Sequence, residues 1–376
     1  MTSRERVLTA LAHRPPDRVP RLLYEEVIGY TPPIERLVRE KCAPKTPRDH
    51  FSMDITRVTF EPSVLSRHRF AEWLGDQADE ALGSGQVNEW GVWLKAGDFH
   101  HFTHIESPLR GQQDFQRLQA YPWPDLDQPY RFRGVRQQIE ALHAAGLAVA
   151  AYAGSVFERS WSIRGFEDLM MDLLTAPAVV HYFFERTAAF QQFAAEQFAR
   201  AGADIIITGD DVAGQQGLLM RLETWREFLK PRLAATVQAV KQANPAAYVL
   251  YHSDGKVDTL IPELIEIGID ILNPVQPECM NAAAIKRRYG DRLSLWGTVS
   301  VQRTMPGGTP DEVRAEVGLR VRELGQRGGL ILAPAHVLGP EVPWSNIVAF
   351  FEAADAVNPY YPAPTAAAPD RCPLLP

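Results

Sequence analysis

The sequence predicts an α/β protein folded as a parallel (β/α)₈ barrel. Its second half alternates short apolar runs with amphipathic, helix-like segments, which is typical of parallel strands joined by crossover helices. A chain of 376 residues is long for one domain, but α/β barrels form single units of this size. We therefore expect one barrel domain over residues 1–360 and a loosely ordered tail, rich in proline and alanine, over 361–376.

The first half of the chain supplies three of the expected strands, at 18–24, 52–60 and the beginning of 146–160. Pro20 weakens the first of them, because proline cannot donate a hydrogen bond within a sheet. Between the second and third strands, residues 86–107 have the aromatic, β-branched and turn residues of a β-hairpin. We expect this hairpin to be an insertion after the second strand that covers part of the barrel.

Five consecutive strand–helix units complete the chain. The expected strands lie at 203–211, 247–255, 269–277, 292–300 and 329–337, and a helix-like segment follows each. In barrels of this kind the catalytic groups lie just after the carboxyl ends of the strands. The polar residues at those places are therefore the candidates for a functional site.

Charge and cysteine content exclude several classes of function. The net charge is −7 and no run of lysine and arginine occurs, which argues against nucleic-acid and membrane-surface partners. No apolar run approaches the roughly 20 residues needed to cross a bilayer, and the first residues lack the apolar core of a signal peptide. The three cysteines, Cys42, Cys279 and Cys372, are far apart and suggest neither disulfides nor a thiolate metal site. These features predict a cytoplasmic protein.

Acidic residues dominate the strand ends. Asp210 and Asp211 follow a buried strand directly, and two adjacent carboxylates there repel each other unless a cation, a shared proton or a substrate compensates. One of the pair could instead cap the next helix, and we expect one functional and one structural acid. We predict catalytic roles for Asp210 and Asp211 and substrate contacts for Asp54, Glu158 and Gln276.

A second group of residues could bind a metal ion. His252 and Asp254 are two positions apart at a strand end and so project to the same side, and His336 follows the eighth strand, which could meet them across the barrel mouth. The alternative is that each histidine binds a carboxylate or the substrate without metal. His100, His101 and His104 also have metal-like spacing, but their hairpin context favours a solvated strand face.

Taken together, the strand-end segments resemble the uroporphyrinogen decarboxylase superfamily, which also contains the methyltransferases of corrinoid-dependent methyl transfer. The segments that carry the resemblance are SRERVLTALAHRPPDRVP, EWGVWL, ITGDDVAGQQG, YHSDG, DILNPVQP, LWGTVSVQRTMP and LAPAHVLGPEVPWSNI. The resemblance implies the barrel fold and a site at its mouth. True decarboxylases of this superfamily have an arginine-bearing RxxGR-like segment after the first strand, where this chain has YEEVIGY. Glu25 and Glu26 at that place would repel a polyanionic porphyrinogen.

The methyltransferase branch binds zinc through a His-x-Cys segment and a second cysteine. By this resemblance His252 matches the histidine, while Asp254 and His336 occupy the cysteine positions. A set of nitrogen and oxygen ligands can still bind a divalent metal, with zinc as the first choice. The resemblance thus implies a methyltransferase-like enzyme for a small methylated substrate, with a corrinoid protein as possible partner. The alternatives are a metal-independent decarboxylase or lyase and a non-catalytic barrel that binds a tetrapyrrole or a corrinoid protein.

Overall fold

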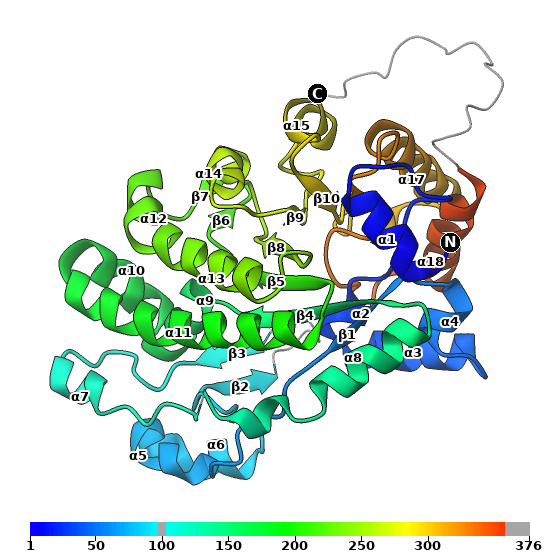
Figure 1. Ribbon diagram of the computed structural model, residues 1–376. Helices are drawn as coiled ribbons and strands as arrows, with labels where there is room; N and C mark the ends of the chain where they lie inside the picture. The colour runs from blue at the N-terminus through cyan, green and yellow to red at the C-terminus, as the bar shows by residue number, and fades with distance from the viewer. Residues whose placement is uncertain (97–102, 126, 358–376) are drawn as a thin grey trace.

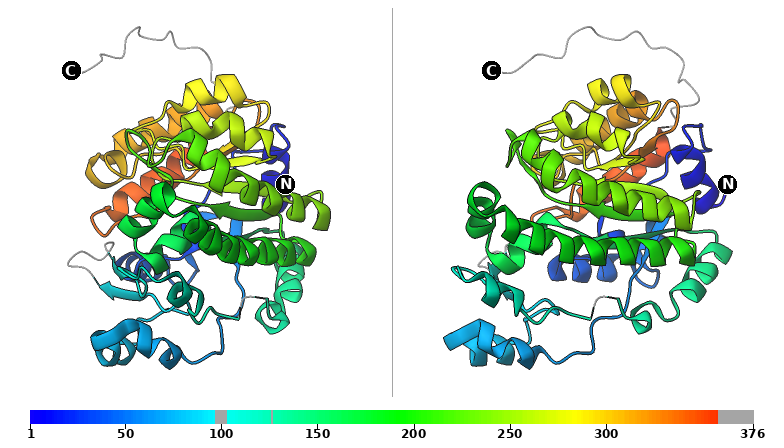
Figure 2. Two further views of the ribbon diagram at one scale, coloured as in Figure 1. Left: turned by 90° about the vertical axis from the view of Figure 1, so that its left-hand side faces the viewer. Right: turned by 60° about the vertical axis from the view of Figure 1, so that its left-hand side comes forward.

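A computed structural model describes residues 1–96, 103–125 and 127–357 of the chain (Figure 1). Its centre is a seven-stranded parallel sheet with the order β1-β4-β5-β8-β9-β10-β11. The strands are β1 (Ile55–Val58), β4 (Ala148–Gly154), β5 (Ile205–Gly209), β8 (Tyr248–His252), β9 (Ile271–Asn273), β10 (Ser294–Trp296) and β11 (Leu330–Ile331). The sheet curls, and helices lie around its outside (Figure 2). The predicted α/β class with a parallel sheet is therefore confirmed.

The strand predicted at 18–24 is reduced to an isolated bridge between Arg21 and Leu332. The Leu332 N–H donates to the Pro20 carbonyl at 2.8 Å, and the Leu22 N–H donates to the Leu332 carbonyl at 3.1 Å. On the other side, the Asp54 N–H donates to the Arg21 carbonyl at 3.0 Å. The segment thus contacts both edges of the sheet, but Pro20 lacks an N–H group and a regular strand does not form.

Apolar strands and crossover helices form the core. All five residues of β5 are buried, as expected for a parallel strand covered on both faces. The helices from α8 to the end of the described chain are α8 (Val135–Ala144), α9 (Phe157–Arg164), α10 (Phe166–Thr175), α11 (Pro177–Ala201), α12 (Leu222–Phe228), α13 (Lys230–Ala243), α14 (Ile261–Glu266), α15 (Ala282–Tyr289), α16 (Thr304–Gly307), α17 (Pro310–Leu324) and α18 (Trp344–Ala356). A short antiparallel pair, β6 (Ala213–Gly214) and β7 (Gly217–Leu218), follows β5.

The amino-terminal part of the chain adds short helices and an antiparallel pair of strands. The helices are α1 (Ser3–Leu11), α2 (Glu25–Ile28), α3 (Pro32–Cys42), α4 (Pro47–Phe51), α5 (Ala71–Leu74), α6 (Ala78–Gly83) and α7 (Phe115–Gln119). Strands β2 (Trp93–Ala96) and β3 (Thr103–Glu106) pair with Trp93 opposite Glu106. The turn between these strands, which includes His100 and His101, lies outside the described residues. That the pair is an insertion covering the barrel stays a prediction.

Two further expectations concern membrane-spanning segments and the tail of the chain. Within residues 1–96, 103–125 and 127–357, no helix is long and apolar enough to span a membrane. The predicted tail at 361–376 lies outside the described residues.

Candidate active site

Three residues at or just after the ends of β5 and β8 bring possible metal-binding atoms together at the carboxyl ends of the sheet. One atom each of Asp211, His252 and Asp254 lie within 4.8 Å of one another. The His252 Nε2 atom is 3.6 Å from the Asp211 Oδ1 atom. We call these three residues the aspartate–histidine cluster. Two of them belong to the predicted metal set, whereas Asp211 was predicted to be catalytic.

Hydrogen bonds fix the ring of His252. Its Nδ1 atom lies 2.7 Å from Asn273 Oδ1 and 3.0 Å from the Tyr24 hydroxyl, and the Tyr24 ring stacks on the imidazole with centroids 5.7 Å apart. The Asn273 amide group donates to the Trp296 carbonyl at 3.2 Å, so Asn273 Oδ1 is the acceptor that faces His252. This arrangement places the proton on Nδ1 and leaves the Nε2 lone pair facing Asp211.

The turn that carries Asp254 is also held from several sides. The Asp254 N–H donates to Asp211 Oδ1 at 2.7 Å, and the Gly255 N–H donates to Gln276 Oε1 at 2.6 Å. Gly255 has φ +82°, and a Cβ atom there would lie 2.6 Å from the Ala213 carbonyl oxygen, so only glycine fits. The oxygen of Gln276 is thus used to hold this turn. A substrate contact by Gln276, which stays a prediction, would therefore use its amide nitrogen.

Charges within the aspartate–histidine cluster shift its pKa values. Burial lowers the pKa of His252, but the nearby Asp211 and Asp254 carboxylates outweigh this effect and the net pKa is raised. Burial raises the pKa of Asp254, against the opposing effect of His336 and His252. The Asp254 Oδ1 atom is buried and has no hydrogen-bond partner among the described residues. An unsatisfied buried carboxylate oxygen is costly, and a cation would satisfy it.

Asp210 and Glu158 form a second acidic pair beside the cluster. Asp210 is buried, and its Oδ1 atom accepts the Glu158 N–H at 3.0 Å in the first turn of α9. Burial raises the pKa of Asp210 to about 8, although backbone N–H groups of α9 lower it. Burial and the neighbouring Asp211 and Asp210 carboxylates raise the pKa of Glu158 to about 8. Both carboxyl groups are therefore shifted towards the protonated form, and Asp210 accepts the N–H of the first turn of α9 as a capping acid does.

His336 lies at the edge of the cluster rather than within it. Its Nε2 atom is 3.6 Å from Asp254 Oδ2, and its ring centroid is 6.5 Å from that of His252. The side chain is 37% exposed, so it can reach a ligand in the mouth. Tyr24 and Asn273 were not predicted as site residues. Tyr24 lies at the end of the strand expected at 18–24, whereas Asn273 lies in the middle of the strand expected at 269–277 and at the end of the observed β9.

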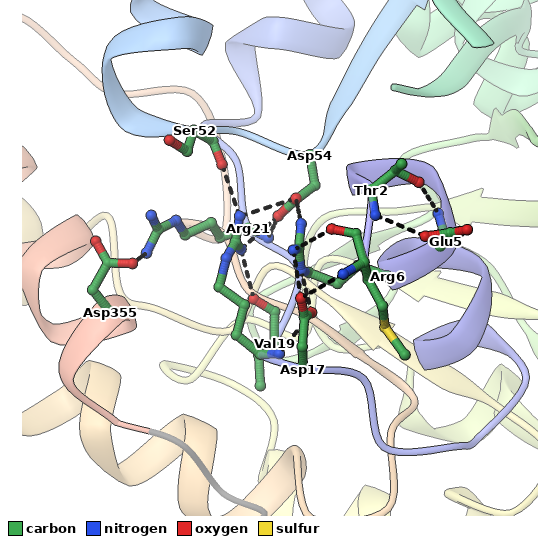
Figure 3. Close-up of polar contacts among 11 residues, drawn as sticks. Thr2, Glu5, Arg6, Asp17, Val19, Arg21, Ser52, Asp54 and Asp355 are labelled. Carbon is green, nitrogen blue, oxygen red and sulfur yellow. Dashed lines mark hydrogen bonds and ion pairs between the residues drawn. The ribbon is translucent and has the colours of Figure 1, made fainter. Parts of the chain in front are cut away.

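Asp54 does not join the other predicted site residues. It precedes β1 and so lies at the amino end of the sheet, opposite the aspartate–histidine cluster. Its oxygens bind Arg6 Nη1 at 2.7 Å and Arg18 Nη1 at 2.7 Å, and they accept the Arg21 N–H at 2.9 Å. Figure 3 shows Asp54 among these polar contacts, with Arg6 and Arg21 beside it. The predicted substrate contact is therefore corrected to a structural role, because every face of this fully buried carboxylate is already occupied.

The cluster has the chemistry of a divalent metal site. Two carboxylates and one imidazole supply oxygen and nitrogen donors, which suit zinc as well as harder divalent ions. Such an ion would need the Nε2 atom of His252, which faces Asp211, and the Oδ1 atom of Asp254, which has no hydrogen-bond partner among the described residues. His336 is close enough to Asp254 to act as a further ligand or as a substrate contact.

Comparisons with known proteins point to one family. The family model described as "Uroporphyrinogen decarboxylase (URO-D)" matches residues 88–357. The methylcobamide:CoM methyltransferase MtaA of Methanosarcina barkeri is 29% identical over 231 residues, which are 58% of this chain and 64% of that protein. The match therefore spans slightly less than two thirds of that relative. The uroporphyrinogen decarboxylase of Chlorobium luteolum is 27% identical over 368 residues, covering 92% of this chain and 96% of its own.

A solved structure supports the same fold. The chain is similar to a methyltransferase from Methanosarcina mazei with a TM-score of 0.65 and 19% sequence identity. The similarity covers 95% of this chain and 99% of that chain. At this identity the likeness concerns the fold alone.

Proposed function

The chain belongs to the uroporphyrinogen decarboxylase (URO-D) family, and from this premise we propose that it is a methyltransferase-like enzyme acting on a small methylated substrate. The observation that carries the proposal is the aspartate–histidine cluster at the carboxyl ends of β5 and β8. Relatives that act on methylcobamide and coenzyme M support methyl transfer, and a corrinoid protein is the partner we propose. We also propose that the segment around Arg21 closes the curled sheet into a (β/α)₈ barrel.

In this proposal Asp211, His252 and Asp254 hold a divalent metal ion, with zinc as the first candidate. Such an ion acts as a Lewis acid that lowers the pKa of a bound thiol or hydroxyl group. Asn273 and Tyr24 orient His252 so that its Nε2 atom faces Asp211. The ligands of the metal are then fixed before it binds, which favours affinity.

The acidic pair beside the cluster has a separate task. Glu158 is half-buried, and burial followed by the carboxylate of Asp211 raises its pKa to about 8, which favours the protonated form at neutral pH. We assign to Glu158 the proton that a heteroatom of the substrate takes up when its methyl group passes to the corrinoid, and that a thiol gives up when methyl transfer runs in the opposite direction. Asp210 keeps the first turn of α9, and with it Glu158, in place.

Charge at the mouth argues against uroporphyrinogen as the substrate. The segment at residues 24–30 has Glu25 and Glu26 where true decarboxylases have arginines. Asp211 and Asp254 add further carboxyl groups near the strand ends. A polyanionic tetrapyrrole would meet repulsion from these groups rather than a cationic grip.

A second candidate function is a metal-independent decarboxylase or lyase for a small substrate. It is favoured by the pKa values of about 8 at Asp210 and Glu158, which make both groups proton donors at neutral pH. Relatives named uroporphyrinogen decarboxylase also match almost the whole chain. The two candidates differ in their need for metal. A cytoplasmic location stays a prediction from the sequence.

Metal analysis separates the two candidates. The protein is purified without chelator, and its metal content is measured by mass spectrometry for wild type, Asp211→Asn, His252→Gln and Asp254→Asn. Asp258→Asn is the matched control, since Asp258 is exposed four positions beyond Asp254 and outside the cluster. We expect near-stoichiometric metal in wild type and the control, and at least about tenfold weaker binding in the three variants.

The same proteins are then assayed for methyl transfer from free methylcobalamin to thiol acceptors. Activity should follow metal content across the variants. Metal-free wild-type protein that retains full methyl transfer would contradict the metal role. Decarboxylation of a small acid by metal-free protein, without methyl transfer, would favour the second candidate.

A further inference from the structure

An arginine lies among the acids at the carboxyl ends of the strands. Arg159 follows Glu158 in the first turn of α9, directly after the carboxyl end of β4. The central carbon of its guanidinium group, Cζ, lies over the Trp90 ring, 4.8 Å from the ring centroid. The Trp90 side chain is 4% exposed and packs edge-to-face on Trp123 and Phe190, with centroids 6.3 and 5.4 Å away. Arg159 therefore rests on an aromatic platform that packing holds in place.

The N–H groups of Arg159 have no partner within the part of the chain that the structure describes. No hydrogen bond or ion pair joins them to another described residue. The residue is half-buried, and its nitrogen atoms are not among the buried atoms that lack a partner, unlike the Nε atoms of Arg69 and Arg232. A guanidinium group on an aromatic face keeps its N–H edge available for an anion. A ligand can therefore reach this edge of Arg159.

The neighbours of Arg159 place it at the same mouth as the aspartate–histidine cluster. Tyr152 is 38% exposed, although the other residues of β4 are buried. Burial of its hydroxyl group and the Glu158 carboxyl group raise the pKa of Tyr152, whereas Arg159 lowers it. Burial and then Tyr152 raise the pKa of Tyr24, whose ring stacks on His252. Tyr152 is thus close to Arg159 on one side and to the cluster on the other.

The acids of the mouth act on Arg159 at a distance but do not bind it. Burial and the Asp211 carboxylate raise the pKa of Glu158 to about 8, and the charge of Arg159 opposes this rise only in part. Glu158 and Arg159 nevertheless form no ion pair, and within the described residues no other carboxylate contacts the guanidinium group. The hydrogen-bonding capacity of Arg159 is therefore left for a group that does not belong to these residues.

We propose that Arg159, held on Trp90, binds a carboxylate group of the substrate, so that the substrate is a small methylated carboxylic acid. This inference rests on the proposed function, because it names the substrate class of the same mouth. A carboxylate presents two oxygens in one plane to the paired N–H groups of a guanidinium. A polyanion would bring further charges against Asp211 and Asp254, and a cation would be repelled by Arg159. The carboxylate end then lies at Arg159 and the methyl-bearing heteroatom lies towards Glu158 and the cluster.

Three matched probes test this carboxylate site by isothermal titration calorimetry with the full chain as purified. The probes are methoxyacetate, methoxyacetamide and methoxyethylamine, which share a methoxy group and differ in charge at the other end. We expect methoxyacetate to bind at least about tenfold more tightly than methoxyacetamide, and methoxyethylamine to bind most weakly. Equal affinities for methoxyacetate and methoxyacetamide, or no heat from any probe, would overturn the proposal.

Substitutions of Arg159 separate a direct contact from a general effect of charge. Arg159→Gln should reduce the affinity for methoxyacetate to that for methoxyacetamide. Arg159→Lys keeps the charge but loses the paired N–H groups, so it should retain only part of the preference. Arg186→Gln is the matched control, because Arg186 also lies over an aromatic ring, 5.9 Å from the Tyr182 centroid, but is exposed on α11. A preference that persists in Arg159→Gln, or is undiminished in Arg159→Lys, would refute the contact.

Folding, metal binding and methyl transfer are followed in the same variants. Arg159 is outside the aspartate–histidine cluster, so Arg159→Gln should keep the metal content and thermal midpoint of wild type. If Arg159→Gln does not fold, Arg159→Lys carries the test. A carboxylate preference that depends on Arg159, in a protein that transfers no methyl group, would refute the proposed function and leave the carboxylate site standing. Methyl transfer by wild type without any preference for methoxyacetate over methoxyacetamide would refute this inference alone.

Discussion

Replacement of Asn273 tests whether the site is built around the tautomer of His252. Asn273 is fully buried, accepts the His252 Nδ1 proton at 2.7 Å and donates to the Trp296 carbonyl at 3.2 Å. Asn273→Ala removes both hydrogen bonds, and each buried bond lost costs about 1–3 kcal/mol of stability. We therefore expect the free energy of unfolding to fall by about 2–5 kcal/mol.

The effect of Asn273→Ala on metal binding is the informative part. Without Asn273, only the Tyr24 hydroxyl at 3.0 Å remains to hold Nδ1 of His252. That hydroxyl can donate as well as accept, so the proton can move to Nε2 and block the metal lone pair. Loss of a partner that orients a metal-binding histidine typically weakens metal affinity by about 10–100-fold. We expect a loss in this range for zinc, measured by competition with a chelating dye.

Asn273→Asp is the matched variant. It keeps the acceptor for His252 and loses the donor to Trp296. It should therefore be destabilised but should retain most of the zinc affinity. Zinc affinity that is unchanged in Asn273→Ala, with only the unfolding free energy reduced, would refute the tautomer argument and leave Asn273 as a purely structural residue.

Three further predictions concern the acids and the substrate. Burial raises the pKa of Asp210 to about 8, so the folded state binds this proton more tightly than the unfolded chain, and the resulting stabilisation is present at acidic pH and lost as the pH rises through about 8. Asp210→Asn should reduce this loss of stability, measured by urea titrations between pH 5 and pH 9. A pH profile of stability that is the same in wild type and Asp210→Asn would argue against the raised pKa. Asp54→Asn should destabilise the protein by about 3 kcal/mol, since it breaks the buried contacts to Arg6 and Arg18, yet leave metal content intact; a change in substrate affinity without loss of stability would instead restore the role predicted from sequence. Incubation with uroporphyrinogen should give no coproporphyrinogen, and steady turnover to that product, followed by fluorescence, would overturn the argument from the acidic mouth.

The periodic pattern of the chain was sufficient for much of the fold. The apolar runs at 203–211 and 247–255 form β5 and β8. A run of buried residues between helical segments finds partners for its backbone N–H and C=O groups within a parallel sheet. The same reasoning failed at 18–24, where Pro20 and contacts to both sheet edges leave a bridge between Arg21 and Leu332. The local sequence does not reveal how many residues of a segment will form hydrogen bonds with the neighbouring strands.

Proximity to strand ends indicated the candidate site but did not assign roles to its residues. That rule identified Asp211, His252 and Asp254, and the structure brings their atoms within 4.8 Å of one another. It misplaced Asp54, which belongs to the amino end of the sheet, since a residue inside a predicted strand can face either end. It also missed Asn273, whose role depends on a histidine that lies 21 positions earlier in the chain.

The sequence by itself determined the alternation of strands and helices, the family and the acidic character of the strand ends, because each of these depends on residue types in a local order. Only the tertiary structure decided which acids lie together, which one is neutralised by Arg6 and Arg18, and which nitrogen of His252 faces Asp211. Those properties depend on distances and burial among residues that are far apart in the chain. Those distances depend on the curvature of the sheet, which no single segment of the sequence determines.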